Sequence, residues 1–209
     1  MNDAKPPIVS IEEWNVARDA LLLEEKQATR ALDAIAAKRR RLPMVHFGND
    51  YQFDTPNGPK SLLDFFGDNK QLVAYQFMDV GPDNFCGGCT WFTNNVADLA
   101  SLVANGASWI TISDMPLSQF EGYATTKNWS VPIASSHGTT FRSDCGSEGG
   151  FLLTVFYRDG DDIYRTYSTT SRGVDRLLFV NNILDLLPYG RQEDWEDSPE
   201  GWPQLPTYG

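Results

Sequence analysis

Apolar residues in the first part of the chain recur about every seven positions, as they do along one face of a long helix. Ser10 precedes this pattern and Glu13 follows three residues later, which is the capping-box arrangement of a helix N-terminus. Leu42 and Pro43 end the pattern. The sequence therefore predicts one helix from Ser10 to Arg41. Its narrow apolar stripe contains Trp14, Leu21, Ala28 and Ile35, with Ile11, Ala17 and Leu32 on the intermediate turns.

The stripe does not indicate which surface it covers. Two expectations stay open: the helix packs on the globular body of its own chain, or it forms a homodimer contact with a second copy. The basic run from Lys38 to Arg41 lies at the C-terminus of this helix, where cations complement the helix dipole. We interpret the run in that way rather than as a nucleic-acid-binding patch.

Strand-like apolar runs then alternate with helical segments. Strands are predicted at Leu72–Met78, Ser108–Ser113 and Val131–Ser135, with helices at Cys86–Val103 and Pro116–Lys127 between them. This alternation is typical of parallel strands joined by right-handed crossovers. Two further strands, Phe151–Arg158 and Ile163–Ser168, flank the hairpin signal Asp159-Gly160, and a helix at Arg172–Leu187 follows.

This order of elements is that of a thioredoxin-like fold, an α/β fold with a central mixed sheet flanked by helices. We expect a helical extension over residues 1–42, a thioredoxin-like domain over residues 43–187 and a Trp- and Pro-rich tail over residues 188–209. A chain of 209 residues, 41% of them hydrophobic, is long enough to bury one substantial core.

The tetrapeptide Cys86-Gly87-Gly88-Cys89 places two thiols one turn apart at the predicted start of a helix. Unpaired N–H groups and the positive end of the dipole favour the thiolate there. Because only a thiolate attacks a disulfide, we expect Cys86 to attack and Cys89, one turn further in, to resolve the mixed disulfide. A pair of half-buried structural cysteines is the plainer interpretation.

A metal site is the other interpretation of these cysteines. Zinc or an iron–sulfur cluster normally needs four closely placed ligands, and the chain offers one C-x-x-C motif, Cys145, His46 and His137. The sequence contains no second C-x-x-C and no H-x₃₋₅-H. We therefore expect neither a metal nor a cofactor.

Three further residues are candidate auxiliary groups for proton transfer. Asp79 and Asp83 flank the loop before Cys86, and His137 lies in a loop after the third predicted strand. For each of them, solvation on a loop is the plainer interpretation. Cys145 lies in a Gly- and Ser-rich loop, and we interpret it as a tolerated thiol rather than a third redox thiol.

Charge and hydropathy limit the classes of partner. A formal net charge of −11 argues against nucleic acid and anionic membranes. No apolar run is long enough to span a bilayer and no signal-peptide core is present, so we expect a cytoplasmic protein. In a reducing compartment a C-x-x-C motif is more typical of catalysis than of a structural disulfide. The expected partners are a protein or small-molecule disulfide and a thiol reductant.

Five stretches carry a more specific resemblance: Lys38–Val45, Gly81–Cys89, Thr154–Gly160, Tyr164–Thr169 and Gly190–Pro203. Together they resemble the DUF899 family of thioredoxin-like proteins over nearly the whole chain. Members of that family are described as predicted dithiol–disulfide oxidoreductases, which is the activity that the resemblance implies. It also implies that Cys86 and Cys89 form the family's C-x-x-C.

The chain departs from thioredoxins at one place. Thioredoxins usually hold a cis-proline before the hairpin strand that faces the cysteines, whereas the stretch from Gly149 to Leu152 contains no proline. We therefore expect a substrate groove that is more open or differently gated.

These observations favour a dithiol–disulfide oxidoreductase, and two alternatives stay open. A thiol peroxidase would act through a sulfenate on Cys86. Peroxiredoxins carry a Thr three residues before the reactive cysteine, and Asp83 occupies that place here. The second alternative is a non-catalytic binding or metal-holding module on the same fold.

Overall fold

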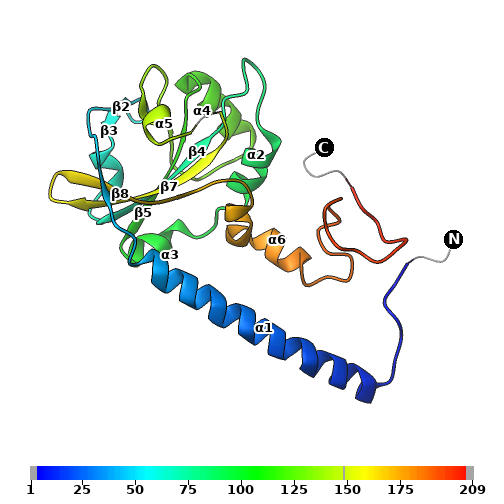
Figure 1. Ribbon diagram of the computed structural model, residues 1–209. Coiled ribbons are helices and arrows are strands. Elements are labelled where there is room, and N and C mark those ends of the chain that lie inside the picture. Colours follow the sequence, from blue (N-terminus) through cyan, green and yellow to red (C-terminus); the bar gives the residue numbers. More distant parts are fainter. Residues whose placement is uncertain (1–3, 148, 206–209) are drawn as a thin grey trace. The chain divides into compact units, whose positions relative to one another are not determined.

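The computed structural model describes residues 4–147 and 149–205, which divide into two compact units (Figure 1). One unit is Met44–Ile183. The other contains residues 4–43 together with residues 184–205. The finer division at residues 42 and 187 stays a prediction.

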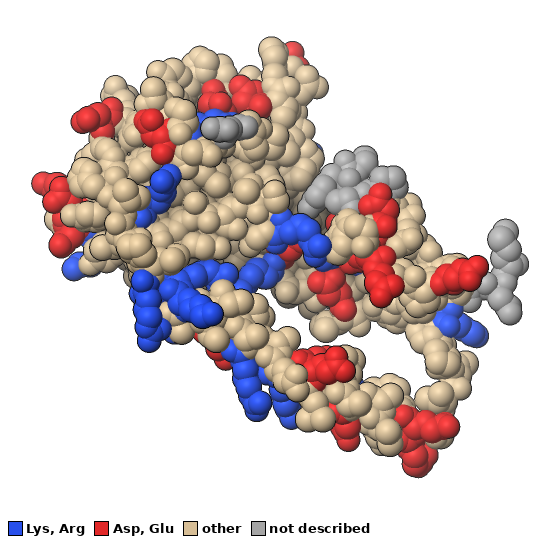
Figure 2. Space-filling model, in the orientation of Figure 1, with Lys and Arg blue, Asp and Glu red and all other residues tan. Residues whose placement is uncertain are grey.

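The first unit contains helix α1 (Ile11–Arg39). The Glu13 N–H donates to Ser10 Oγ at 3.2 Å and the Ser10 N–H donates to the Glu13 carboxylate at 3.0 Å, so the predicted capping box is formed. No residue of α1 is buried, and Trp14 and Leu21 are about half exposed. Figure 2 shows Asp and Glu side chains towards one end of α1 and Lys and Arg side chains towards the other.

The C-terminal part of this unit is an irregular segment organised around Arg191, whose side chain is 9% exposed. The guanidinium forms ion pairs with Asp185, Glu193 and Glu196. The Tyr189 hydroxyl donates to the Ala4 carbonyl at 2.7 Å. These contacts join the two ends of the described chain within one unit.

Among the residues described, the other unit is built on a six-stranded mixed sheet with the order β1-β8-β7-β4-β5-β6. Strands β4, β5 and β6 are parallel, and β7, β8 and β1 continue the sheet in antiparallel pairs. The bounds are β1 Val45–Phe47, β4 Gln71–Phe77, β5 Ala107–Ser113, β6 Ile133–Ser135, β7 Leu152–Asp159 and β8 Asp162–Thr169. A separate two-stranded sheet pairs β2 (Gln52–Phe53) with β3 (Lys60–Ser61).

The helices and 3₁₀ turns between these strands are η1 Leu63–Phe66, α2 Gly87–Asn94, α3 Leu99–Ala104, α4 Leu117–Thr126 and α5 Phe141–Asp144. After β8 come η2 Ser171–Leu177 and α6 Phe179–Leu184. The order β4-α2-β5-α4-β6, then the β7–β8 hairpin and α6, confirms the predicted thioredoxin-like fold (Figure 1). The expected long N-terminal helix is also confirmed.

Two predicted helices were wrong in extent. The helix expected over Cys86–Val103 is interrupted, because Asp98 adopts a left-handed conformation (φ 42°). The Asp98 carboxylate accepts a hydrogen bond from the Ser101 N–H and thereby caps a second helix, α3. The helix expected over Arg172–Leu187 is divided because Leu178 is extended between η2 and α6.

The central strand β4 is buried on both faces, and alternate side chains enter two different hydrophobic clusters. Leu72 and Ala74 pack in a cluster with Phe53 and Phe156. Tyr75 and Phe77 pack in the other cluster. The sheet therefore separates two cores.

Over residues 4–147 and 149–205, the structure contains no helix that combines the length and hydropathy needed to cross a bilayer.

Candidate active site

The two cysteines of the C-x-x-C motif lie at the carboxyl end of β4, in the first turn of α2. Cys86 has an extended backbone (φ −60°, ψ 117°) and is the N-cap of α2. Its Sγ accepts a hydrogen bond from the Cys89 N–H at 3.2 Å. A sulfur thus occupies the place where a Ser or Asp oxygen usually caps a helix. All three cysteines of the chain are free thiols in this structure.

This position favours the thiolate of Cys86. A hydrogen bond from the Cys89 thiol, supported by the N–H groups of Cys89 and Gly88, lowers the pKa of Cys86 to about 6, although burial opposes the change. The pKa of Cys89 is raised, because its thiol donates that hydrogen bond and because it is buried. At neutral pH the reduced pair is therefore a Cys86 thiolate that shares the Cys89 proton.

Cys89 is fully buried but lies beside two hydrogen-bond donors. The Met78 N–H donates to Cys89 Sγ at 3.5 Å, and the neighbouring Tyr75 phenol also lowers the pKa of Cys89. The Met78 thioether lies 3.8 Å from Cys86 Sγ, so Met78 contacts both sulfurs. These donors can stabilise a thiolate on Cys89 once Cys86 has lost its charge.

The loop before Cys86 is fastened to α4. The rings of Phe85 and Tyr123 stack with centroids 3.6 Å apart and planes 2° apart. The Tyr123 hydroxyl lies 2.9 Å from Thr90 Oγ1, one residue after Cys89. The stacking on Phe85 and the contact with Thr90 together hold the chain on both sides of the motif.

The structure places Asp79 and Asp83 within that loop. Asp79 Oδ1 accepts from the Gly81 N–H at 2.9 Å, and Asp83 adopts a left-handed conformation (φ 61°). In the part of the chain that is described, neither carboxylate forms a hydrogen bond with a thiol. Both residues shape the turn, and their part in proton transfer stays a prediction.

His137 lies next to Asp114 at the end of β5, and its Nδ1 is 2.9 Å from the Asp114 carbonyl oxygen. Together with Tyr51, Asp54 and Asp144 it lines a polar pocket of about 600 Å³ that includes neither residue of the dithiol. The structure thus gives His137 a position away from hydrogen-bonding contact with Cys86 and Cys89.

Cys145 lies on the other face of the sheet from the dithiol. It is 3% exposed and packs in the cluster of Leu72 and Ala74, whereas Cys86 and Cys89 belong to the cluster of Tyr75. Burial raises the pKa of Cys145 to about 12, although the neighbouring Gln76 side chain opposes this change. A thiol that is protonated and separated by the sheet has no direct route to the dithiol.

Across residues 4–147 and 149–205, no group of three or more His, Cys, Asp or Glu side chains is arranged to hold a metal ion. The dithiol is therefore not part of such a group.

Arg142 is a residue of this region whose contacts the sequence did not predict. Its guanidinium pairs with Asp114 at 2.6 Å and donates to the Gly150 carbonyl at 2.9 Å. Gly150 lies two residues before Leu152, whose partner in β4 is Gln76, the last residue of β4 that pairs with β7. Arg142 therefore helps to anchor the segment before β7, which is where thioredoxins usually hold the cis-proline that this chain lacks.

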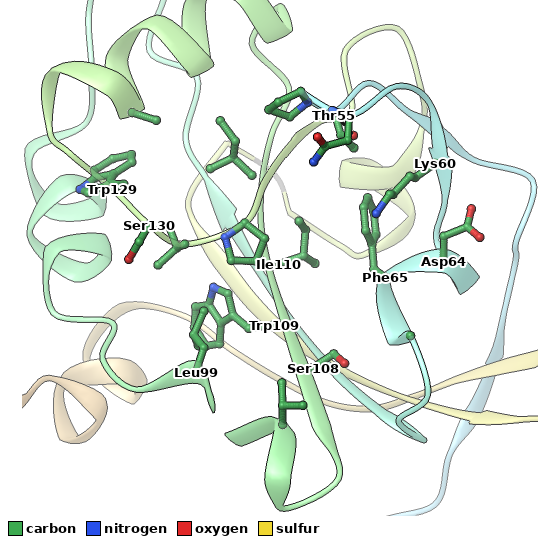
Figure 3. A pocket seen from close by; sticks show the side chains of 18 of the residues that line it. Thr55, Lys60, Asp64, Phe65, Leu99, Ser108, Trp109, Ile110, Trp129 and Ser130 are labelled. Carbon is green, nitrogen blue, oxygen red and sulfur yellow. Dashed lines mark hydrogen bonds between the residues drawn. The ribbon is translucent and has the colours of Figure 1, made fainter. Parts of the chain in front are cut away.

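A larger pocket, of about 910 Å³, is a separate feature of this unit (Figure 3). Trp109 and Trp129 line it together with Leu99, and Lys60 extends into it from β3. The pocket lies beside the first half of β5. The strand β6 does not cover this half, since it pairs only with Thr111–Ser113 in the second half of β5. None of its lining residues is Cys86 or Cys89, so pocket volume does not identify the chemistry here.

Known structures similar to this one include three redox proteins. Peroxidoxin BcpB from Mycobacterium tuberculosis is 17% identical, with 63% of this chain and 86% of that chain covered and a TM-score of 0.45. A secreted M. tuberculosis disulfide oxidoreductase homologous to E. coli DsbE is 12% identical, with 61% and 90% covered and a TM-score of 0.42. Thioredoxin from Wuchereria bancrofti is 15% identical, with 56% and 83% covered and a TM-score of 0.41.

A search of curated proteins found no match. At the level of sequence families, residues 3–208 match the family described as "Bacterial protein of unknown function (DUF899)", and the chain belongs to this family.

Proposed function

We propose that this protein is a dithiol–disulfide oxidoreductase in which Cys86 attacks a substrate disulfide and Cys89 resolves the product. The observation that carries this proposal is the position of Cys86 Sγ, which caps α2 and accepts the Cys89 N–H. With a pKa of about 6, Cys86 is mostly thiolate at pH 7, and the thiolate is the form that attacks disulfides.

In the first step the Cys86 thiolate attacks one sulfur of a substrate disulfide. The substrate S–S bond breaks, a Cys86–substrate disulfide forms, and the other substrate sulfur leaves as a thiolate that takes a proton from water. Cys86 now carries no negative charge. This removes the hydrogen bond to Cys86 that most strongly raises the pKa of Cys89.

In the second step Cys89 loses its proton and attacks Cys86 Sγ. The Met78 N–H and the Tyr75 phenol stabilise the Cys89 thiolate during this step. The Cys86–Cys89 disulfide forms, and the second substrate sulfur leaves and takes up one proton. Two electrons have passed from the protein to the substrate, and an external dithiol restores the reduced pair by the reverse exchange.

The proposed partners are a protein or small-molecule disulfide and a thiol reductant. We place the reaction in the cytoplasm, where reducing conditions keep a C-x-x-C pair available for exchange. The net charge of −11 disfavours nucleic acid and anionic membranes as partners.

The proposal is tested by trapping the intermediate. A Cys89→Ser variant incubated with oxidised glutathione should accumulate a mixed disulfide at Cys86, because the resolving thiol is missing. Cys86→Ser should lose disulfide reductase activity to the background rate, while a Ser at this position can still cap α2. The matched control is Cys145→Ser, which should trap nothing and keep its activity.

Peroxide in place of oxidised glutathione distinguishes the peroxidase alternative. A peroxidase would yield a Cys86 sulfenate in Cys89→Ser at a rate far above that of free cysteine. The oxidoreductase proposal predicts slow reaction with peroxide and fast reaction with disulfides. If Cys86→Ser reduced disulfides as fast as the wild type, the proposal would be wrong.

A further inference from the structure

Helix α1 carries exposed apolar side chains along its whole length. Trp14 and Leu21 in its first half are 53% and 52% exposed, and Leu32 and Ile35 in its second half are 44% and 42% exposed. These residues share one face, since they follow the helical repeat. Helices in water gain most of their stability by packing an apolar face, so this stripe requires a covering surface.

The charges on α1 are divided between its two halves (Figure 2). From Ile11 to Glu25 the helix holds five acidic residues and one basic residue, whereas from Lys26 to Arg39 it holds four basic residues and one acidic residue. The helix dipole explains only the charges of the first and last turns. Asp19, Glu24 and Arg30 lie further inside and need another explanation.

We propose that the stripe is covered by α1 of a second copy of this chain, with the two helices antiparallel. In that orientation the acidic half of each helix lies along the basic half of the other, and two-fold symmetry repeats this contact. A parallel pair would instead place acidic halves together and basic halves together. Charge complementarity therefore favours a second α1 as the covering surface and an antiparallel orientation of the two helices.

The antiparallel arrangement also matches the apolar residues. The stripe has large side chains near both of its ends, so Trp14 of one copy lies near Leu32 and Ile35 of the other. The seven-residue spacing of Trp14, Leu21, Ala28 and Ile35 matches the heptad repeat of a left-handed coiled coil. The dimer contact is independent of the dithiol chemistry proposed above.

Sedimentation equilibrium of the full chain with reductant tests the proposal. The wild type should have twice the 23.4 kDa mass of one chain at micromolar concentration and should dissociate on dilution. Leu21→Glu, which places a charge on the stripe, should raise the dissociation constant at least about 100-fold. Leu23→Glu is the matched control, because Leu23 is 61% exposed and lies off the stripe, and it should leave the dimer intact.

A charge exchange tests the direction and does not touch the apolar residues. Changing Glu12, Asp19 and Glu24 to Lys gives both halves of α1 a net positive charge, and changing Lys26, Arg30 and Lys38 to Glu gives both halves a net negative charge. Each variant alone should be monomeric, and an equimolar mixture should form a heterodimer. All six side chains are exposed, so these variants carry the test even if Leu21→Glu fails to fold.

A wild-type chain that stays monomeric at about 100 μM would overturn the proposal. This is also the result expected if the stripe packs on its own chain. A dimer that tolerates Leu21→Glu as well as Leu23→Glu would also overturn it, because the contact would then lie elsewhere. Two charge variants that each form homodimers as tight as the wild type would contradict the antiparallel pairing.

Discussion

The backbone N–H of Cys89 donates a hydrogen bond to Cys86 Sγ at 3.2 Å, so the sulfur of the first cysteine of the motif caps the backbone N–H of the second. The three-residue spacing produces this contact, because a helix N-cap is reached by the N–H of the third residue that follows it. The same turn brings the Cys89 thiol to Cys86 as a second donor. The motif therefore generates its own thiolate without a charged neighbour.

Stability of the reduced protein should depend on pH between about 6 and 8.5. The pKa of Cys86 is about 6 in the folded chain, below the value of about 8.5 for an unfolded cysteine. A lowered pKa stabilises the folded state above the unfolded pKa, and this contribution is lost as the pH falls towards 6.

The measurement is the urea midpoint of reduced wild type and of Cys86→Ser from pH 6 to pH 8.5. The wild type should gain stability relative to the variant as the pH rises. Parallel profiles for the two proteins would contradict the lowered pKa of Cys86.

Removal of the Tyr75 hydroxyl should slow the second chemical step alone. Tyr75→Phe keeps the ring that stacks on Phe92 but loses the hydroxyl that lowers the pKa of Cys89. We expect resolution of the mixed disulfide to slow roughly tenfold, the size expected for one hydrogen bond to a charged group.

Single-turnover kinetics separate the two steps, and Tyr123→Phe is the matched control because its hydroxyl contacts Thr90 rather than a sulfur. An equal slowing of the first attack in Tyr75→Phe would refute a role specific to Cys89.

Cys145→Ser should leave disulfide reduction unchanged within about twofold, because the sheet separates Cys145 from the dithiol and its thiol is protonated at neutral pH. Turnover with a dithiol reductant and an aromatic disulfide measures this. A loss comparable to that of Cys86→Ser would instead assign Cys145 a relay role.

Arg142→Gln should weaken the use of protein disulfides more than of small disulfides. The substitution leaves Asp114 without its ion pair and removes one hydrogen bond to the Gly150 carbonyl, which keeps the one from Ser147 Oγ. The segment before β7 is therefore held less firmly. We expect a roughly tenfold higher KM for a protein substrate with kcat and the pKa of Cys86 unchanged.

Arg142→Lys should recover part of this KM, since a lysine can restore one of the two contacts. A change in the pKa of Cys86 itself would show that Arg142 acts on the thiolate rather than on the neighbouring segment.

The sequence was sufficient to predict the order of strands and helices and the helix start at Cys86, because these follow from local periodicity and capping. It was insufficient where a side chain competes with the helix, as Asp98 does by capping α3. The contacts of Tyr75 and Arg142 were not predicted, because they depend on strand register and on residues far apart in the chain. Asp79 and Asp83 were chosen because they flank the loop before Cys86, and His137 because it lies in a loop after a predicted strand. Neither criterion determines where a side chain points.

The rate of Cys86 alkylation as a function of pH tests the central claim most directly. Reduced protein is treated with iodoacetamide between pH 4 and pH 9, and modification of each cysteine is followed by mass spectrometry. The account predicts that Cys86 reacts first, with a midpoint near pH 6, and that mild oxidation protects it by a Cys86–Cys89 disulfide. A midpoint near 8.5, as for a free thiol, together with no such disulfide after oxidation, would contradict the account.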